Sequence, residues 1–278
     1  RSAIGLKYLP ALLASRDKIA KGLRMMRAIR AGGVPMFQDV SRLKATGSDR
    51  LAGLAFTAGG RTTTLAADSL LVHEGIVPNT QLSRALNCEH VWDDRQQGWR
   101  PVLDGFGESS IAHVFIVGDG AAIDGALAAP ASAAIAVGRI LEQMGRSDAR
   151  SRASCVAAMA TFARERRFRG FLDALYPPRL SASRCSDDTI VCRCEEASAG
   201  SLRAAVADGA IGPAQAKVFT RCGMGACQGR VCGSIAEETG KSIADIGSHH
   251  VRFPLKPITL AEMAALADTN DGDDAHAA

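Results

Sequence analysis

The sequence has 278 residues, 47% of them hydrophobic and 22% charged, which is the composition of an ordinary water-soluble protein large enough for two domains. Its net charge of +4, from 33 basic and 29 acidic residues, is too small to indicate a nucleic-acid or membrane-surface partner. No apolar stretch reaches the roughly 18 residues that a membrane-spanning helix needs, and we expect a cytoplasmic protein without a membrane span.

The first quarter of the chain predicts a helix followed by strands. Residues 11–31 place Ile19, Leu23, Met26 and Ile29 at helical spacing and stop at two glycines, which predicts one amphipathic helix. Three short runs rich in apolar and β-branched residues then predict a strand meander, at residues 34–40, 50–59 and 62–75.

The next segment combines turns with a candidate ligand site. A turn at Pro78-Asn79 leads into a short helix, and residues 90–110 alternate strand-like pieces with turn residues. Residues 113–119, "HVFIVGD", have the composition of a buried strand, and residues 125–141 predict a helix of small residues able to pack closely on a sheet. A carboxylate at such a strand end can accept hydrogen bonds from ribose or ribityl hydroxyls, while the following helix N-terminus faces phosphate.

Residues 151–176 predict a connecting helix that ends at Pro177-Pro178. Its arginines are expected to form a solvated face, and Cys155 is expected to be a small core residue. The helix therefore separates the preceding α/β segment from a cysteine-rich segment.

The cysteines are clustered, since five of the eight lie between residues 192 and 232, and this favours a metal site over disulfides. One residue separates Cys192 from Cys194, 32 residues lie between Cys194 and Cys227, and four lie between Cys227 and Cys232. Four thiolates from two loops suit either tetrahedral zinc or a 2Fe-2S cluster. By counting alone, Cys222 can pair with Cys227 equally well.

Two features favour the cluster over zinc. A Cys-x-Cys pair is less usual for structural zinc, which prefers two to four intervening residues. Glycines near the second pair leave the backbone room to approach bridging sulfides and donate hydrogen bonds to them, namely Gly223, Gly225, Gly229 and Gly233. The six histidines, including His249-His250, are expected at the surface or at a hinge rather than as ligands.

The motifs "GIVPNTQL" and "VFIVGDGAAIDG" together resemble the C-terminal part of the FAD domain in two-dinucleotide-domain, disulfide-reductase-like flavoproteins. The resemblance implies an α/β fold and a contact from Asp119, flanked by Gly118 and Gly120, to the ribityl or ribose-phosphate region of FAD. No Gly-x-Gly-x-x-Gly phosphate loop follows a strand in this sequence, and its first residue is not Met. We therefore expect an N-terminally truncated fragment, with FAD a cofactor of the full-length protein.

The segment "VCRCEEASAGSLRAAV…TRCGMGACQGRVCG" resembles the bacterioferritin-associated-ferredoxin-like (BFD-like) 2Fe-2S domain of a family of α (A) subunits. These are the α subunits of bacterial opine oxidases, hydrogen cyanide synthase and D-hydroxyproline dehydrogenases. The tail "RFPLKPITLAEMAAL" resembles the closing segment of the same family. The resemblance implies that the cluster ligands are Cys192, Cys194, Cys227 and Cys232, with Cys222 a bystander.

The predicted architecture is the C-terminal part of such an α/β flavoprotein followed by a small, mainly helical 2Fe-2S domain. We expect a partial nicotinamide-type dinucleotide domain at 1–75, the C-terminal part of the FAD-binding domain at 76–148, a helical connector at 149–185, the BFD-like 2Fe-2S domain at 186–240 and a C-terminal tail at 241–278.

The resemblance implies an electron-transfer subunit of a multi-subunit amino acid, opine or amine dehydrogenase or oxidase. Such a subunit belongs to an FAD-dependent oxidoreductase that acts on C–N bonds, with the catalytic centre on a β-type flavoprotein partner and room for a small third subunit. No catalytic residue is assigned to this chain. Two alternatives remain: a self-contained NAD(P)H-dependent flavin reductase, and a zinc-binding interaction module that uses the same thiolates only for folding.

Overall fold

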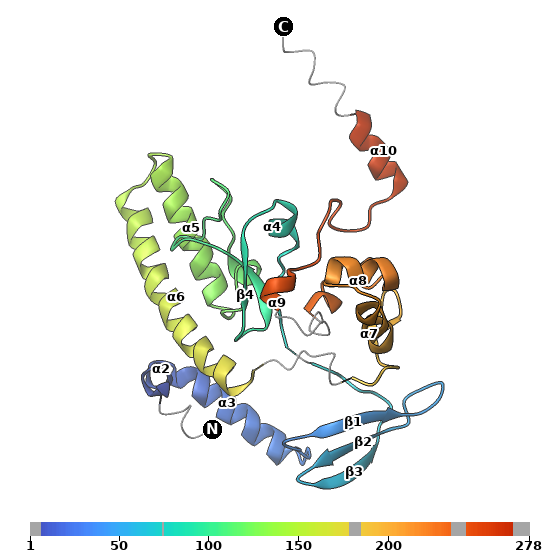
Figure 1. Ribbon diagram of the computed structural model, residues 1–278. Coiled ribbons are helices and arrows are strands. Elements are labelled where there is room, and N and C mark those ends of the chain that lie inside the picture. The colour runs from blue at the N-terminus through green and yellow to red at the C-terminus, as the bar shows by residue number, and fades with distance from the viewer. Residues whose placement is uncertain (1–6, 74, 178–184, 235–242, 269–278) are drawn as a thin grey trace. The chain divides into compact units, whose positions relative to one another are not determined.

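The computed structural model of the protein describes residues 7–73, 75–177, 185–234 and 243–268. It divides the chain into two compact units, and each is considered by itself (Figure 1). The first unit contains the described residues up to 73, and the second contains the described residues from 75 onward.

The first unit combines two helices with a three-stranded antiparallel meander. The single predicted helix is in fact two, α2 (Leu9–Ala14) and α3 (Arg16–Ala31), because the chain breaks at Ser15. The meander consists of β1 (Ser41–Thr46), β2 (Gly53–Ala58) and β3 (Arg61–Ala66), paired in that order.

The strand expected at residues 34–40 does not form. Asp39 has a left-handed backbone, with a φ of 51°, and this conformation ends an extended run before the ladder begins at Ser41. Phe37 instead packs edge-on against Phe56 of β2, with ring centroids 4.9 Å apart. The predicted meander is therefore confirmed, but its first strand lies later in the chain.

The second unit begins with the Pro78-Asn79 turn, which leads into α4 (Gln81–Ala85) as predicted. The hairpin of β4 (His90–Asp93) and β5 (Gly98–Pro101) follows. Trp92 and Trp99 form a cross-strand pair with ring centroids 5.8 Å apart. A Cβ at Gly98 would lie 3.2 Å from Cδ of Pro78, so the absence of a side chain lets the hairpin approach the turn closely.

Residues 113–117 do not form the predicted buried strand. They pair only locally, since the Ser109 N–H donates to the Val114 carbonyl and the Ile116 N–H donates to the Gly107 carbonyl, both at 2.8 Å. A buried parallel strand requires neighbouring strands, and no strand of the described residues pairs with this segment beyond a single bridge at Phe115. The segment leads into the short 3-10 turn η1 (Gly118–Gly120).

The helices α5 (Ala128–Gln143) and α6 (Ala149–Leu175) lie side by side (Figure 1). The small residues of α5 pack against α6 rather than against a sheet. A Cβ at Gly138 would lie 2.9 Å from both Cβ and Sγ of Cys155, which shows how closely the helices approach. Cys155 packs against the cluster formed by Ala131, Ile135 and Ala158, which confirms it as a core residue.

Replacing Gly138 with valine is expected to lower the free energy of unfolding by about 1–3 kcal/mol, because the added carbons would overlap Cys155. Urea unfolding followed by helical circular dichroism measures this change. Gly22→Val in α3 is the matched control, since nothing lies within 4 Å of a Cβ at Gly22. An equal loss of stability in both variants would contradict close packing of α5 on α6.

Polar contacts join the hairpin to α6. The buried Gln96 side chain donates from Nε2 to the Asp173 carboxylate at 3.4 Å, and Arg169 pairs with the same carboxylate at 2.6 Å. Arg166 lies 3.8 Å from the Asp124 carboxylate, and burial raises the pKa of Asp124. Two of the arginines expected on a solvated face therefore form ion pairs: Arg166 joins α6 to the segment before α5, and Arg169 pairs within α6 with the carboxylate that Gln96 contacts.

The cysteine-rich segment forms a small domain of short elements within the second unit. They are β6 (Ile190–Cys192), β7 (Ala197–Ser198), α7 (Ala199–Ala207), α8 (Pro213–Thr220) and η3 (Cys232–Ser234), followed by α9 (Ile243–Ile246) and α10 (Leu260–Asp268). The two helices predicted between the cysteine pairs are confirmed. The core of this domain is built largely from small side chains, which let the backbone segments lie close together. Its members include Ala197, Ala199, Leu202, Ala205, Ala210 and Ala216.

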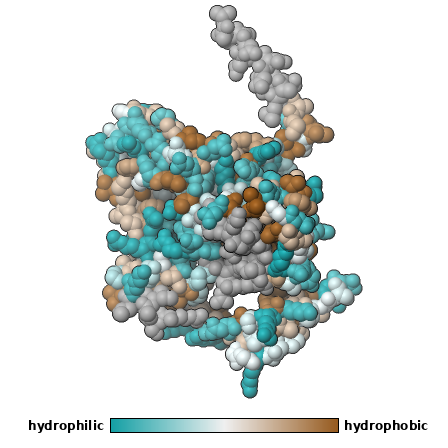
Figure 2. All heavy atoms as spheres, viewed as in Figure 1, coloured by the Kyte–Doolittle hydropathy of each residue, from teal (hydrophilic) through white to brown (hydrophobic). Residues whose placement is uncertain are grey.

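The exposed surface mixes apolar and polar side chains on the face shown in Figure 2, with apolar residues of α10 prominent near its edge. Leu260 and Met263 of this helix are 85% and 51% exposed. Among the residues that the structure describes, no helix is long and apolar enough to cross a lipid bilayer.

Candidate metal centre

The cysteine loops bring five thiols together. Cys192 is the last residue of β6, and Cys194 follows in the turn between β6 and β7. Cys222 and Cys227 lie in the loop after α8, and Cys232 begins η3. Short elements therefore deliver all five side chains to one region of the domain.

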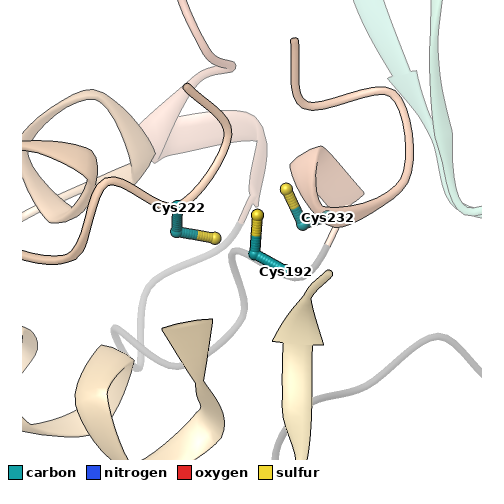
Figure 3. A group of neighbouring side chains, drawn as sticks. All are labelled: Cys192, Cys222 and Cys232. Carbon is teal, nitrogen blue, oxygen red and sulfur yellow. The ribbon is translucent and has the colours of Figure 1, made fainter. Parts of the chain in front are cut away.

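Three of these thiols form a buried group. The sulfur atoms of Cys192, Cys222 and Cys232 all lie within 4.8 Å of one another, and each residue is at most 4% exposed. Figure 3 shows their sulfur atoms turned toward a common space, with Cys192 at the end of β6 and Cys232 on the short η3 turn. This arrangement brings one residue of the Cys-x-Cys pair to two residues of the later cysteine segment.

The remaining two thiols, of Cys194 and Cys227, hydrogen-bond to each other. Cys194 is exposed and Cys227 is half-buried. Cys192 is close enough to Cys194, and Cys227 to Cys232, for their charges to interact. All four cysteines of the predicted ligand set therefore lie in one group, and Cys222 lies in the same group beside Cys192 and Cys232.

Backbone N–H groups surround the sulfur of Cys227. Burial raises the pKa of this thiol, but hydrogen bonds from the N–H groups of Val231, Gly229 and Arg230 and from Cys194 outweigh it, so the pKa of Cys227 is lowered. Left-handed backbones at Gln228 and Gly229, with φ of 50° and 77°, shape this turn. The loop thus favours the thiolate form, which is the form that binds metal.

The neighbouring thiols resist ionisation in the absence of a cation. The Cys227 N–H favours the Cys194 thiolate, but the hydrogen bond that Cys194 donates to Cys227 and the charges of nearby sulfurs leave the pKa of Cys194 raised. The hydrogen bond to Cys222 and burial raise the pKa of Cys232. Several thiolates this close together require positive charge between them, and a soft metal ion or iron-sulfur cluster supplies it.

Glycine at position 225 lets the two loops meet. A Cβ at Gly225 would lie only 2.2 Å from Cβ of Cys194 and 3.1 Å from Oε1 of Glu195. Arg221, which ends α8 with a left-handed backbone, pairs with Glu195 at 2.7 Å across the same junction. The absence of a side chain at Gly225 therefore lets the two loops meet at Cys194, and the approach of the glycine backbone to bridging sulfides stays a prediction.

His249 lies in the interior, so the expectation of a surface or hinge position is wrong for this residue. It is 9% exposed, and its ring covers the cysteine loop: Cβ atoms at Gly223, Gly229 and Gly233 would lie 2.9, 3.5 and 3.3 Å from ring atoms. Burial, reinforced by nearby positive charges, lowers the pKa of His249 to about 4. These three glycines leave a flat space for the ring on the loop. Their recurrence in the cysteine loop was the sequence signal that a flat group packs there.

The predicted FAD-contact residues lie in η1. Gly118 has a left-handed φ of 64°, and its N–H donates to Oγ of Ser132 in α5 at 3.0 Å. A Cβ at Gly120 would lie 3.7 Å from the Asn79 carbonyl oxygen, so the two motifs of the FAD-domain resemblance meet here. The Asp119 side chain is exposed. Within the described residues this turn supplies only one element of a dinucleotide site.

The cysteine domain matches a known protein family. Residues 187–267, which include all five clustered cysteines, match the sarcosine oxidase A3 domain family. The chain is 39% identical over 271 residues to the A subunit of opine oxidase from Rhizobium meliloti and 38% identical over 274 residues to the corresponding protein of Agrobacterium tumefaciens. Each match covers 95% of this chain, and 51% and 54% of the respective relatives.

The chain is similar to the A subunits of opine oxidases over nearly its whole length. These matches confirm the resemblance to the α (A) subunits of opine oxidases and hydrogen cyanide synthase. The chain is also similar to hydrogen cyanide synthase subunit HcnB of Pseudomonas aeruginosa, to which it is 30% identical over 270 residues, covering 90% of this chain and 57% of that protein. These relatives are named as subunits of an opine oxidase or of hydrogen cyanide synthase, and the chain spans about half of their length.

A solved structure shares the fold of this chain. The solved structure of L-proline dehydrogenase from P. horikoshii superimposes with a TM-score of 0.64 over 87% of this chain and 48% of that chain, at 18% sequence identity. The chain therefore shares the fold of that structure over most of its length.

Proposed function

We propose that this chain transfers electrons within a multi-subunit amino acid, opine or amine oxidoreductase, through a 2Fe-2S cluster held by Cys192, Cys194, Cys227 and Cys232. The observation that carries the proposal is the grouping of five thiols from two loops around one space, with the sulfur of Cys227 surrounded by backbone N–H groups. A 2Fe-2S cluster accepts and releases single electrons, and thiolate ligands hold its iron atoms.

The contacts among the thiols support this choice of ligands over one that includes Cys222. Cys192 contacts Cys232, and Cys194 contacts Cys227, so each contact joins one thiol from each loop. Two such pairs match the two irons of the cluster, each of which takes two thiolates. Cys222 lies beside Cys192 and Cys232, and we assign it as a neighbour of the cluster that fills the core.

The surrounding residues have roles of their own in this proposal. N–H groups of residues 229–231 donate to the Cys227 sulfur, and such hydrogen bonds stabilise negative charge on the ligand and shift the reduction potential upward. Gly225 permits the approach of Cys194, and the His249 ring excludes water from the face of the loop that it covers. None of these residues acts as an acid, a base or a nucleophile.

The remaining parts of the proposal come from the family. In the full-length protein FAD would be held in part by Gly118, Asp119 and Gly120, whose turn faces the Pro78-Asn79 turn. We propose that oxidation of the substrate C–N bond takes place on a β-type flavoprotein partner and that a small third subunit can join the assembly. The relatives are named as subunits, which supports partners of this kind.

Anaerobic purification, iron, sulfide and zinc analysis, and electron paramagnetic resonance after dithionite reduction test the proposal. We expect about two irons per chain and a reduced-state signal. Both should be lost in Cys194→Ser and Cys227→Ser, because each removes a ligand, and kept in Cys222→Ser. Cys155→Ser, which lies in the α5–α6 core, is the matched control and should also keep them.

Two results would contradict the proposal in different ways. A colourless protein with one zinc per chain and no reduced-state signal would exclude electron transfer and leave a zinc-stabilised interaction module. Loss of iron in Cys222→Ser with retention in Cys227→Ser would keep the cluster and overturn the ligand assignment.

A further inference from the structure

A cavity of about 220 Å³ lies between the Pro78-Asn79 turn, the β4–β5 hairpin and the cysteine loop. Gln81 and Arg84 of α4 contribute to its wall, as do Trp92 and Trp99 of the hairpin. Arg230 and the glycines beside it complete the wall from the cysteine loop. The cavity lies outside the η1 turn, and within the described part of the chain no thiol lines it.

Buried polar atoms without partners gather on this wall. Nε of Arg84, Nε1 of Trp99 and Oε1 of Gln81 are buried and make no hydrogen bond within the described part of the chain. Gln81 is only 9% exposed, and its Nε2 is already used to donate to the Gln228 carbonyl at 3.0 Å. An unsatisfied buried polar atom is costly and uncommon, so the two donors, Nε of Arg84 and Nε1 of Trp99, in residues that line one cavity point to a bound acceptor.

The charge of the cavity favours an anion. Arg84 stacks over the Trp99 ring, with Cζ 5.8 Å from the centroid, and has no carboxylate partner among the described residues. Burial lowers the pKa of Arg84 to about 10, which leaves the guanidinium charged at neutral pH. Among the described residues, Arg230 donates to the carbonyls of Cys227 and Leu255, at 3.2 and 3.0 Å, and to no carboxylate. None of the described residues that line this cavity is acidic.

We propose that this cavity binds the oxyanion group of a small molecule, a carboxylate or a phosphate, between Arg84 and Arg230. Oxyanion oxygens accept from guanidinium and indole N–H groups, so one bound group would satisfy Nε of Arg84 and Nε1 of Trp99. Gly229 and Gly233 also line the cavity, so the bound group lies next to the loop that carries Cys227 and Cys232. The ligand would thereby add negative charge beside the cysteine centre.

The tryptophans allow a direct test, because the sequence contains only Trp92 and Trp99 and both line the cavity. Purified chain is titrated separately with inorganic phosphate and with acetate at constant ionic strength, and tryptophan emission is recorded. We expect a saturable change with one or both anions. Arg84→Gln and Arg230→Gln should each weaken binding about tenfold or more, and Arg84→Lys should weaken it less.

Arg95→Gln is the matched control, because Arg95 lies in the same hairpin, is exposed and does not line the cavity. Saturation with phosphate alone or acetate alone identifies the ligand class, and saturation with both supports the shared oxyanion chemistry. A linear response in the wild type, or equal affinities in the wild type and the Arg84 and Arg230 variants, would overturn the proposal. If Arg84→Gln fails to fold, the anion affinities of Arg84→Lys and Arg230→Gln test the proposal instead.

Iron content is measured in the same samples. If anion binding is absent while the iron content is normal, the anion-site proposal is refuted and the electron-transfer proposal stands. If a zinc-loaded or metal-free chain still binds the anion, the electron-transfer proposal is refuted and the anion-site proposal stands.

Discussion

Gly225→Ala is expected to lower metal affinity by at least about 10- to 100-fold while the helices of the cysteine domain stay folded. The added Cβ would lie 2.2 Å from Cβ of Cys194, far inside any contact distance, and neither atom is at the flexible end of a side chain. The turn that carries Cys194 must therefore move away from the Cys227 loop, and the hydrogen bond between the two thiols must lengthen. Iron per chain after anaerobic reconstitution, with competition by a chelator, measures the effect.

Gly105→Ala provides the control for this substitution. Nothing lies within 4 Å of a Cβ at Gly105, which belongs to the same unit but not to the cysteine domain, so its iron content should match the wild type. Circular dichroism of both variants checks that the helices remain. Full iron binding by Gly225→Ala would mean that the contact between the loops is not required for the centre.

Acidification is expected to destabilise the wild type through His249. Burial lowers the pKa of this residue to about 4 in the folded chain, whereas an unfolded histidine has a pKa of about 6.5. Between these values the unfolded state binds more protons, so the free energy of unfolding falls as pH falls from about 6.5 toward 4. The slope approaches about 1.4 kcal/mol per pH unit, which amounts to about 2 kcal/mol between pH 7.5 and pH 5.

His249→Phe isolates this contribution, because phenylalanine keeps a flat ring over the glycines but does not titrate. The difference between the unfolding free energies of wild type and variant, from urea titrations at several pH values, should shrink or reverse as pH falls. Protonation of the thiols affects both proteins and cancels in the difference. His73→Phe, at an exposed position, should leave the pH dependence unchanged. A constant difference from pH 7.5 to pH 5 would show that His249 titrates normally.

Local patterns predicted the helices well, because their apolar periodicity and end signals act within each segment. The small-residue helix α5, the long α6 with its capping Asp148 and the pair α7 and α8 all follow from residues close in sequence. The errors concern strands. Residues 34–40 and 113–117 have strand-like composition, yet a strand also needs a partner with which to pair, and the structure provides other contacts instead.

The sequence by itself predicted the cysteine centre, since clustered thiols with glycines between them indicate a metal site, and the same segment carries the resemblance to the α (A) subunits. Only the tertiary structure decided which groups surround that centre. Cys222 joins the buried thiols, His249 covers the glycines, and Arg84 reaches a cavity beside Arg230. A contact such as that between Gln81 and Gln228 joins residues 147 positions apart. Short-range periodicity cannot encode such contacts, because they depend on how the folded segments pack.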